Sequence, residues 1–221
     1  MYATVTTWRV PASVNASDER TRLVHDLFAR GIEQARRAGV LDVLMIEVEP
    51  DLLMAVSVFE TLDEATAARP GANRFIDDRY AGKLEFVSSA TGPAFDPRQL
   101  AGADRLDVLE GREADVMNVS LVTWRLDSEL QSNDALHSFL HDLWERYAAP
   151  LHRLGLIDVL VIRIADDAIL AVRLYADQIE GNPDYQKAVT AVEEILTGKV
   201  EFIGKQIGRA FDASQLAQPG S

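Results

Sequence analysis

Apolar and polar residues alternate along the chain with two different periods that follow one another in a regular order. Residues 3–10 are rich in Thr and Val and carry Trp8, a composition that is typical of a β-strand. Two further runs, 41–49 and 52–60, alternate with the same period of two and are separated only by a short Pro-Asp turn. Because so short a connection joins antiparallel neighbours, these two runs predict a β-hairpin.

The helical period appears before and after this hairpin. Apolar residues recur at helical spacing over 23–32, and Gly39 is placed to end that helix as a C-terminal cap. Residues 61–64, Thr-Leu-Asp-Glu, are a capping signature for a second helix, which Pro70-Gly71 is expected to interrupt. A last strand is predicted over 84–88 or slightly further. The order strand, helix, strand, strand, helix, strand is that of a ferredoxin-like unit.

The whole pattern occurs twice, as an internal repeat. Thr7-Trp8-Arg9 returns as Thr123-Trp124-Arg125, and the offset is 124 − 8 = 116 residues. The same offset, without gaps, relates His25-Asp26-Leu27 to His141-Asp142-Leu143, Gly82-Lys83 to Gly198-Lys199, and Phe95-Asp96 to Phe211-Asp212. Two units of this size are too few for a solenoid, so we interpret the chain as a fused pair of small domains.

The repeat divides the chain into a first ferredoxin-like α/β-barrel repeat over 1–100, a charged linker over 101–116, and a second such repeat over 117–221. In the second repeat we expect strands at 119–126, 157–164, 169–175 and 200–205, and helices that begin near Asn133 and at Asn182. The fold class is therefore α+β, with tandem βαββαβ repeats. A sheet with both helices on one face leaves the other face bare, so the two copies are predicted to cover each other as an intramolecular dimeric α/β barrel.

The residues of the third strand suggest which face is which. Met54, Val56 and Val58 are uniformly apolar, and we expect them to meet the helices. The alternate residues of this strand, Ala55, Ser57 and Phe59 with their counterparts Ala171, Arg173 and Tyr175, are then assigned to the barrel interior together with Glu47 and Arg163. Buried charges need partners or water, and mixed linings of this kind are typical of small-molecule pockets.

Composition narrows the functional classes. Of 221 residues, 48% are hydrophobic and 26% charged, which suits a soluble globular protein. The net charge of −13 argues against nucleic acid or an anionic membrane as partner. The chain has no cysteine, and therefore no disulfide, thiol nucleophile or thiolate metal site. No secretory signal and no apolar run of membrane-spanning length is seen, so a cytoplasmic location is expected.

The element order, the opening residues 1–9, and Val58-Phe59-Glu60 followed by Leu62-Asp63-Glu64-Ala65 resemble the dimeric α/β-barrel superfamily, and within it the antibiotic-biosynthesis monooxygenase type. The resemblance covers both halves. It implies cofactor-independent oxidation of quinol or polyphenol substrates, or haem degradation in some branches. Many members end the third strand in a tryptophan that lines the pocket, at the position of Phe59 and Tyr175. The Asn, Trp and ligand His of the haem-degrading branch have no matching set in this sequence.

Each residue proposed for the site also has a structural interpretation. Tyr175 and Arg173 are the catalytic candidates, and the substrate-binding candidates are Arg9, Arg125, Glu47, Phe59, Arg163, Trp8 and Trp124. The tryptophans also suit core anchors. The repeated pair of arginines at the end of the first strand also suits salt bridges, and an internal ion pair with the glutamate explains the other two arginines about as well.

The histidines are weak candidates for a metal site. His25 and His141 repeat beside apolar stripes, which favours boundary hydrogen bonds, and His137 with His141 has the i, i+4 spacing of a metal pair in the second copy only. We expect no metal site and no cofactor. Two functions remain open: a cofactor-independent monooxygenase-like oxidoreductase for a small aromatic substrate in the barrel interior, or a non-catalytic ligand-binding or stress-responsive barrel. The expected partner is a small molecule, and further homodimerisation of the internal pseudo-dimer is left open.

Overall fold

The computed structural model describes residues 1–14, 17–48, 51–96, 117–153, 155–175 and 183–212. The chain forms two compact units, one of Met1–Pro93 with Gly208–Ser221 and the other of Ala94–Ile207. The predicted linker at 101–116 and the predicted helix cap Asn182 lie outside the described residues.

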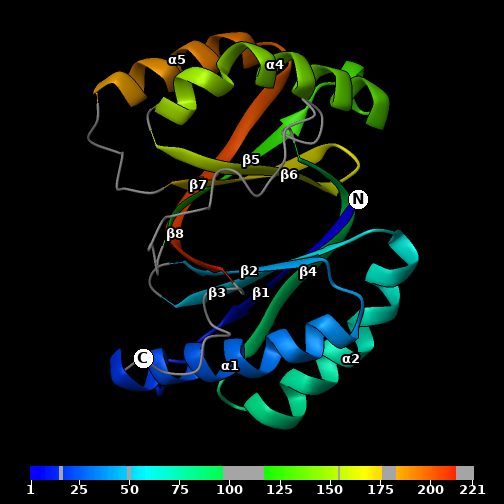
Figure 1. Cartoon of the computed structure of the whole chain (residues 1–221), viewed down its shortest axis with the longest axis vertical. Helices are drawn as coiled ribbons and strands as arrows, with labels where there is room; N and C mark the ends of the chain where they lie inside the picture. Colours follow the sequence, from blue (N-terminus) through cyan, green and yellow to red (C-terminus); the bar gives the residue numbers. More distant parts are fainter. Residues whose placement is uncertain (15–16, 49–50, 97–116, 154, 176–182, 213–221) are drawn as a thin grey trace. The chain divides into compact units, whose positions relative to one another are not determined.

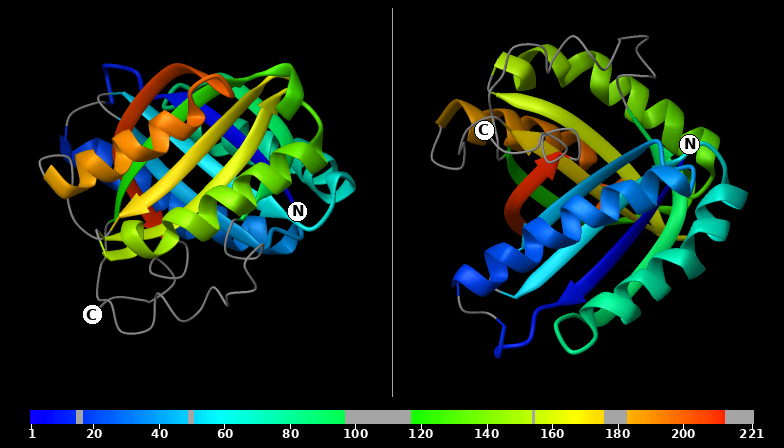
Figure 2. Two further views of the ribbon diagram at one scale, coloured as in Figure 1. Left: turned by 90° about the horizontal axis from the view of Figure 1, so that it is seen from above. Right: turned by 60° about the horizontal axis from the view of Figure 1, so that its bottom comes forward.

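The first unit has the predicted order of elements: β1 (Tyr2–Arg9), α1 (Ser17–Arg37), β2 (Asp42–Val48), β3 (Leu52–Phe59), α2 (Leu62–Tyr80) and β4 (Glu85–Phe95). Its antiparallel ladders run in the order β4-β1-β3-β2, so the first strand lies between the third and the fourth. Helices α1 and α2 cover one face of these strands (Figures 1 and 2).

The second unit repeats this order with β5 (Met117–Leu126), the short 3-10 helix η2 (Ser128–Leu130), α4 (Asn133–Arg153), β6 (Leu156–Ala165), β7 (Ala168–Tyr175), α5 (Pro183–Leu196) and β8 (Val200–Asp212). Strand β7 lies between β5 and β6, as β3 lies between β1 and β2. Helices α4 and α5 cover one face of this sheet (Figure 1).

The last strand of each repeat is longer than predicted, and the extra residues change partners. Ala94 and Phe95 at the end of β4 pair with β6, and residues 208–212 at the end of β8 pair with β2. Pro93 is the last residue of β4 to pair with β1. The proline is tolerated because it lies at the change of partner, where one backbone donor is not needed.

The hydrogen-bonded strand order is β1-β3-β2-β8-β5-β7-β6-β4 and closes on itself. This confirms the predicted fold class of tandem ferredoxin-like repeats of the dimeric α/β-barrel type. None of the described helices is both long enough and apolar enough to cross a membrane.

The assignment of the sheet faces was wrong. Ala55 belongs to the cluster in which Leu23, Val24 and Leu27 of α1 pack on the sheet, so the face with Ala55, Ser57 and Phe59 meets the helices. In the second unit Ala171 likewise packs with Leu136 and Leu140 of α4. Both faces of β3 are buried, so the alternation of apolar and polar residues does not show which face meets the helices. The more polar face was therefore assigned, incorrectly, to the side away from the helices.

Helix ends follow the sequence closely. The Thr61 hydroxyl accepts from the Glu64 backbone N–H and the Glu64 carboxylate accepts from the Thr61 N–H, which confirms the predicted capping box. Gly39 and Gly198, the predicted helix ends, have positive φ values of 79° and 77°, a conformation that favours glycine. The predicted interruption at Pro70 is wrong, since α2 continues through it to Tyr80.

Candidate functional site

Each unit encloses a cavity between its sheet and its two helices. The cavity of the second unit has a volume of about 230 Å³, and that of the first unit about 140 Å³. The larger one is lined from the strands by Val122, Trp124, Val159, Val161, Ile169, Ala171, Arg173 and Tyr175, and from the helices by Phe139, Leu140, Leu143, Trp144, Tyr147, Leu151, Val189, Val192 and Leu196. A predominantly apolar lining with few polar groups is the usual composition of a small-molecule site.

Three of the predicted site residues meet in the larger cavity. Arg173 lies with its Cζ atom 5.0 Å from the centre of the Trp124 ring, a cation–π distance. Tyr175 follows on the same face of β7 and is buried, with 3% of its surface exposed. Three residues that the repeated pattern singled out therefore lie together in this cavity, on the helix side of the sheet and not on the face to which the pattern assigned them.

The strand beside Arg173 carries a buried polar group that the sequence did not suggest. Ser120 lies directly across the β5–β7 ladder from Arg173, and 5% of its surface is exposed. Its hydroxyl is buried and has no hydrogen-bond partner in the part of the chain that the structure describes.

Lys205 of β8 also lines the larger cavity, and its side chain is exposed enough to lie at the rim. From the sequence, Lys205 was expected only to end the last strand. The repeat offset could have found it, since 205 − 116 = 89 and Ser89 shares its side-chain face with Thr6, a lining residue of the smaller cavity.

The remaining arginine and glutamate candidates are placed elsewhere. Arg9 pairs with Asp51 at 3.2 Å, and Arg125 pairs with Glu201 at 2.7 Å and Asp167 at 3.6 Å. Both arginine side chains are about half exposed, at 52% and 53%, and neither lines a cavity described here. These contacts match the salt bridges that the sequence left open as the alternative.

Glu47 and Arg163 occupy equivalent positions but have different partners. The Glu47 carboxylate pairs with the Arg20 guanidinium of α1 at 2.5 Å. The Arg163 guanidinium donates to the carbonyl oxygens of Gln131 at 2.5 Å and Leu130 at 3.2 Å. Both side chains thus hold the start of the first helix of their own unit, and the predicted ion pair between Glu47 and the arginines of the second repeat is replaced by these contacts.

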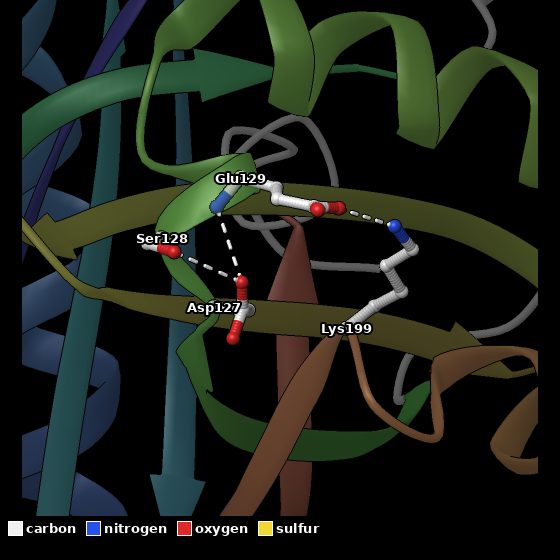
Figure 3. A network of polar contacts seen from close by, with 4 residues as sticks. All are labelled: Asp127, Ser128, Glu129 and Lys199. Atoms are coloured by element: carbon white, nitrogen blue, oxygen red, sulfur yellow. Dashed lines mark hydrogen bonds and ion pairs between the residues drawn. The ribbon is translucent and has the colours of Figure 1, made fainter.

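A polar network fixes the segment that leads into α4 (Figure 3). The Asp127 carboxylate accepts from the Ser128 hydroxyl and the Glu129 backbone N–H, both at 3.2 Å, and so caps η2. The Lys199 ammonium donates to the Glu129 carboxylate at 2.7 Å, which raises the pKa of Lys199 above its ordinary value. Together with Arg163, this network sets where α4, one wall of the larger cavity, begins.

The first unit has its own polar network, on the helix side of the sheet. The Tyr80 hydroxyl donates to the Asp26 carboxylate at 3.0 Å, and Arg30 donates to the same carboxylate at 2.6 Å. Burial first, and then the hydrogen bond to Asp26, raises the pKa of Tyr80 above its ordinary value of 10.0. The hydrogen bond from Arg30 is the largest influence on the pKa of Asp26, which is lowered. This network joins α1 to α2 and is structural.

The smaller cavity contains two further predicted residues, Trp8 and Phe59. Hydroxyl groups of Thr4, Thr6 and Ser57 line its sheet side. The Thr4 hydroxyl is hydrogen-bonded to that of Thr91 at 2.9 Å, whereas the Thr6 and Ser89 hydroxyls are 3.3 Å apart. Its helix side consists largely of small residues such as Gly31, Ala35, Ala38, Ala65, Ala68 and Ala72, with Phe75 and Ile76.

The histidines lie outside the linings of both cavities, although His152 stacks edge-on against Trp144, a lining residue of the larger one. His25 is exposed, His137 stacks edge-on against Phe95, and His141 lies near Asp142 and Glu145. No histidine is among the residues that line either cavity, so these linings offer no imidazole ligand for a haem iron. Within the described residues, no three potential metal-binding side chains gather into a cluster.

The sequence matches no known protein-family profile and no curated protein. Its structure is similar to that of a variant of chlorite dismutase from Candidatus Nitrospira defluvii, with a TM-score of 0.61, 12% sequence identity, and coverage of 98% of this chain and 93% of that one. The same dismutase in complex with imidazole gives a TM-score of 0.60 at 13% identity and the same coverage.

A further similar structure is that of a protein provisionally described as a monooxygenase, from Fusobacterium nucleatum subsp. nucleatum. It has a TM-score of 0.58 and 11% identity over 96% of this chain and 92% of that one. At these identities the similarity establishes the fold alone.

Proposed function

We propose that the chain binds a small phenolic or quinol-type compound in the cavity of the second unit and oxidises it with dioxygen, without a cofactor. The observation that carries this proposal is the group of Trp124, Arg173 and Tyr175 in a cavity whose other lining residues are apolar except for Tyr147 and Lys205. An aromatic ring would stack among the lining aromatics, and its oxygen would face the guanidinium, which favours the ionised phenolate.

The volume limits the ligand to one or two rings. A cavity of about 150 Å³ lined by apolar residues holds one benzene molecule, and the cavity of the second unit is larger, at about 230 Å³. Drug-sized ligands occupy pockets of roughly 300 Å³ or more. A compact naphthol or a substituted phenol is therefore the best fit.

The chemistry needs no electrons from the protein. For 1-naphthol, one atom of dioxygen becomes the carbonyl oxygen at the ring carbon para to the hydroxyl, and the other leaves as water. The products are 1,4-naphthoquinone and water, and all four electrons come from the ring. Arg173 would hold the phenolate, and the Tyr175 hydroxyl would donate to a developing oxygen anion.

The alternative, binding without turnover, is favoured by a specific observation. The described residues that line the larger cavity include neither a carboxylate nor a histidine, the usual general bases. Oxidation therefore depends on a substrate that ionises because of the nearby cations of Arg173 and Lys205, whereas simple binding has no such requirement.

Oxygen uptake with 1-naphthol separates the two functions. We expect quinone formation in step with oxygen consumption, and about a tenfold to hundredfold loss of rate for Tyr175→Phe if the hydroxyl donates in the transition state. Arg125→Ser, an exposed residue outside the cavity, is the control and should keep the full rate. A rise in melting temperature with 1-naphthol, without oxygen uptake, would establish binding and exclude the oxidation.

A further inference from the structure

The cavity of the first unit is formed by residues equivalent to those of the larger cavity, but with different chemistry. Trp8 corresponds to Trp124, so the aromatic wall is retained. Ser57 stands where the second unit has Arg173, and Phe59 where it has Tyr175. The guanidinium and the phenol are thus replaced by one hydroxyl and one apolar ring.

On the sheet side, the polar groups of this cavity are the hydroxyls of Thr4, Thr6 and Ser57. On the helix side, they are the exposed side chains of Gln34, Arg69 and Asn73. Thr6 and Ser89 are separated by 3.3 Å between their oxygens, which is long for a hydrogen bond between hydroxyls. Each hydroxyl has one donor and two acceptor positions, so this weak pair can accept and donate further bonds. A guest with one hydroxyl group would find its partners there.

The remaining lining favours an uncharged guest. Arg69 of α2 is the one charged residue among those described as lining this cavity, and it is exposed to solvent. A charged guest would lose its hydration without gaining a buried counter-charge, which is costly. The volume of about 140 Å³ is close to the roughly 150 Å³ that holds one benzene molecule.

The space exists because of small residues on the helices. Gly31 of α1 lines the cavity, and a Cβ atom added to it would lie 3.9 Å from Phe75, an ordinary contact. The equivalent residue in the second unit is Tyr147, which projects into the larger cavity. The two cavities are therefore shaped by different side chains at the same position.

We propose that the cavity of the first unit is a second binding site, specific for an uncharged compound with a single aromatic ring and one hydroxyl group. It works independently of the cavity of the second unit, and the proposal does not require that the chain oxidise anything. Ring atoms would pack on Trp8 and Phe59, and the hydroxyl would bond to Thr6 and its neighbour Ser89.

The tryptophans make the two sites separately observable. The chain has 3 tryptophans, of which Trp8 lines the smaller cavity and Trp124 and Trp144 line the larger one. The full chain labelled with 5-fluorotryptophan would give three ¹⁹F signals, which Trp→Phe variants assign. Phenol, benzoate and toluene then serve as neutral hydroxylated, anionic and neutral apolar probes at pH 7.

Phenol is expected to shift the Trp8 signal in a saturable way, with a Kd on the order of 1 mM for so small a compound. Benzoate at the same concentrations should leave that signal in place. Gly31→Tyr should abolish the phenol response of Trp8 and leave the Trp124 signal unchanged, while the control Gly31→Ala should keep both, since its methyl group fits.

Thr6→Val provides a test that does not depend on filling the cavity. The change keeps the side-chain shape and removes the hydroxyl, so phenol binding at Trp8 should weaken about fivefold while toluene binding is unchanged. The proposal is overturned if phenol does not move the Trp8 signal, if benzoate moves it as strongly, or if the phenol response survives Gly31→Tyr. These results are independent of whether 1-naphthol is oxidised at the other site.

Discussion

The two cavities occupy the same place in two copies of one structural unit, and they differ in charge. In both, a tryptophan near the end of the first strand forms one wall. In the first unit the neighbouring strand presents Ser57, and in the second it presents Arg173, which stacks on Trp124. At the last strand, Ser89 corresponds to Lys205. Both substitutions add a cation to the second site in a chain whose net charge is −13.

This difference shows what fusing two copies allows. A symmetric homodimer must carry the same residues in both of its sites, because one sequence makes both subunits. In a tandem repeat each copy can change alone. The cavity residues changed in charge, hydrogen-bonding capacity and volume, as the pairs Ser57/Arg173 and Gly31/Tyr147 show. Variants in each unit can test how the two units differ in folding, in ligand binding and in local electrostatics.

The largest expected effect concerns the cores of the two units. Leu53 and Leu136 are completely buried, in the helix-side clusters of the first and second unit respectively. Replacing either by Ala should lower the free energy of unfolding by about 2–5 kcal/mol, because apolar contacts are lost and a cavity remains. Urea unfolding, followed through the ¹⁹F signals of Trp8 and Trp124, measures the loss in each unit.

The same experiment tests whether the units unfold together. Residues at the end of β8 pair with β2, and residues at the end of β4 pair with β6, so each unit needs strand residues from the other repeat. We therefore expect both signals to disappear at one urea concentration, even for Leu53→Ala. If the folded-state signal of Trp8 were lost at a urea concentration that leaves the folded-state signal of Trp124 in place, the repeats would unfold independently.

The next effect concerns the charge of the larger cavity. Arg173→Ser gives the second unit the residue found in the first, and removes the guanidinium that a ligand anion would contact. Benzoate binding at Trp124 should weaken about tenfold to hundredfold, the range for a lost charge-assisted hydrogen bond. Phenol binding at Trp8 should not change. Arg125→Ser, which breaks an exposed salt bridge, is the matched control, and an equal loss in that variant would assign the effect to overall charge.

A smaller effect is expected at the network that joins α1 to α2 in the first unit. Tyr80→Phe removes the hydrogen bond to Asp26, and the counterpart of Tyr80 in the second unit is Leu196. We expect the unfolding free energy to fall by about 0.5–1 kcal/mol near pH 7, the lower part of the usual range, because Asp26 is half exposed. Urea unfolding of both proteins over a range of pH measures the difference.

The stability that the Tyr80–Asp26 hydrogen bond provides depends on pH, with a sign that follows from the two pKa shifts. The pKa of Asp26 is lowered in the folded chain, so its contribution is present above the ordinary value of 3.8 and is lost as the pH falls further. The pKa of Tyr80 is raised, so its contribution is complete below the ordinary value of 10.0 and declines as the pH rises beyond it. A difference that stayed constant through acid pH would contradict the assigned hydrogen bond.

The smallest effect is expected at Lys199, whose ammonium pairs with Glu129 on the surface of the second unit (Figure 3). Lys199→Met should lower the melting temperature slightly at low salt, because exposed ion pairs contribute little. The difference should vanish in 1 M NaCl, where the Debye length is about 3 Å. A loss that persisted at high salt would indicate that the side chain acts through packing on η2 instead.

The amino-acid sequence by itself determined the repeat, the order of elements and the helix ends. These features depend on local interactions: Thr61 caps its own helix, Gly39 adopts its own backbone conformation, and the period of apolar residues distinguishes strand from helix. It also singled out Arg173 and Tyr175, whose counterparts Ser57 and Phe59 differ in chemistry, and Trp124, which is repeated as Trp8.

Only the tertiary structure decided which sheet face meets the helices and where the last strands end. Both faces of β3 are buried, so alternation gave no local sign of which side carried the helices. The partners of Ala94 and Phe95 lie more than sixty residues away in sequence, at Ile162 and Val161, and a pattern read over neighbouring residues contains no information about such pairing. The cavities arise from side chains of separate elements, and their volumes depend on residues such as Gly31 and Tyr147 that no local pattern marks.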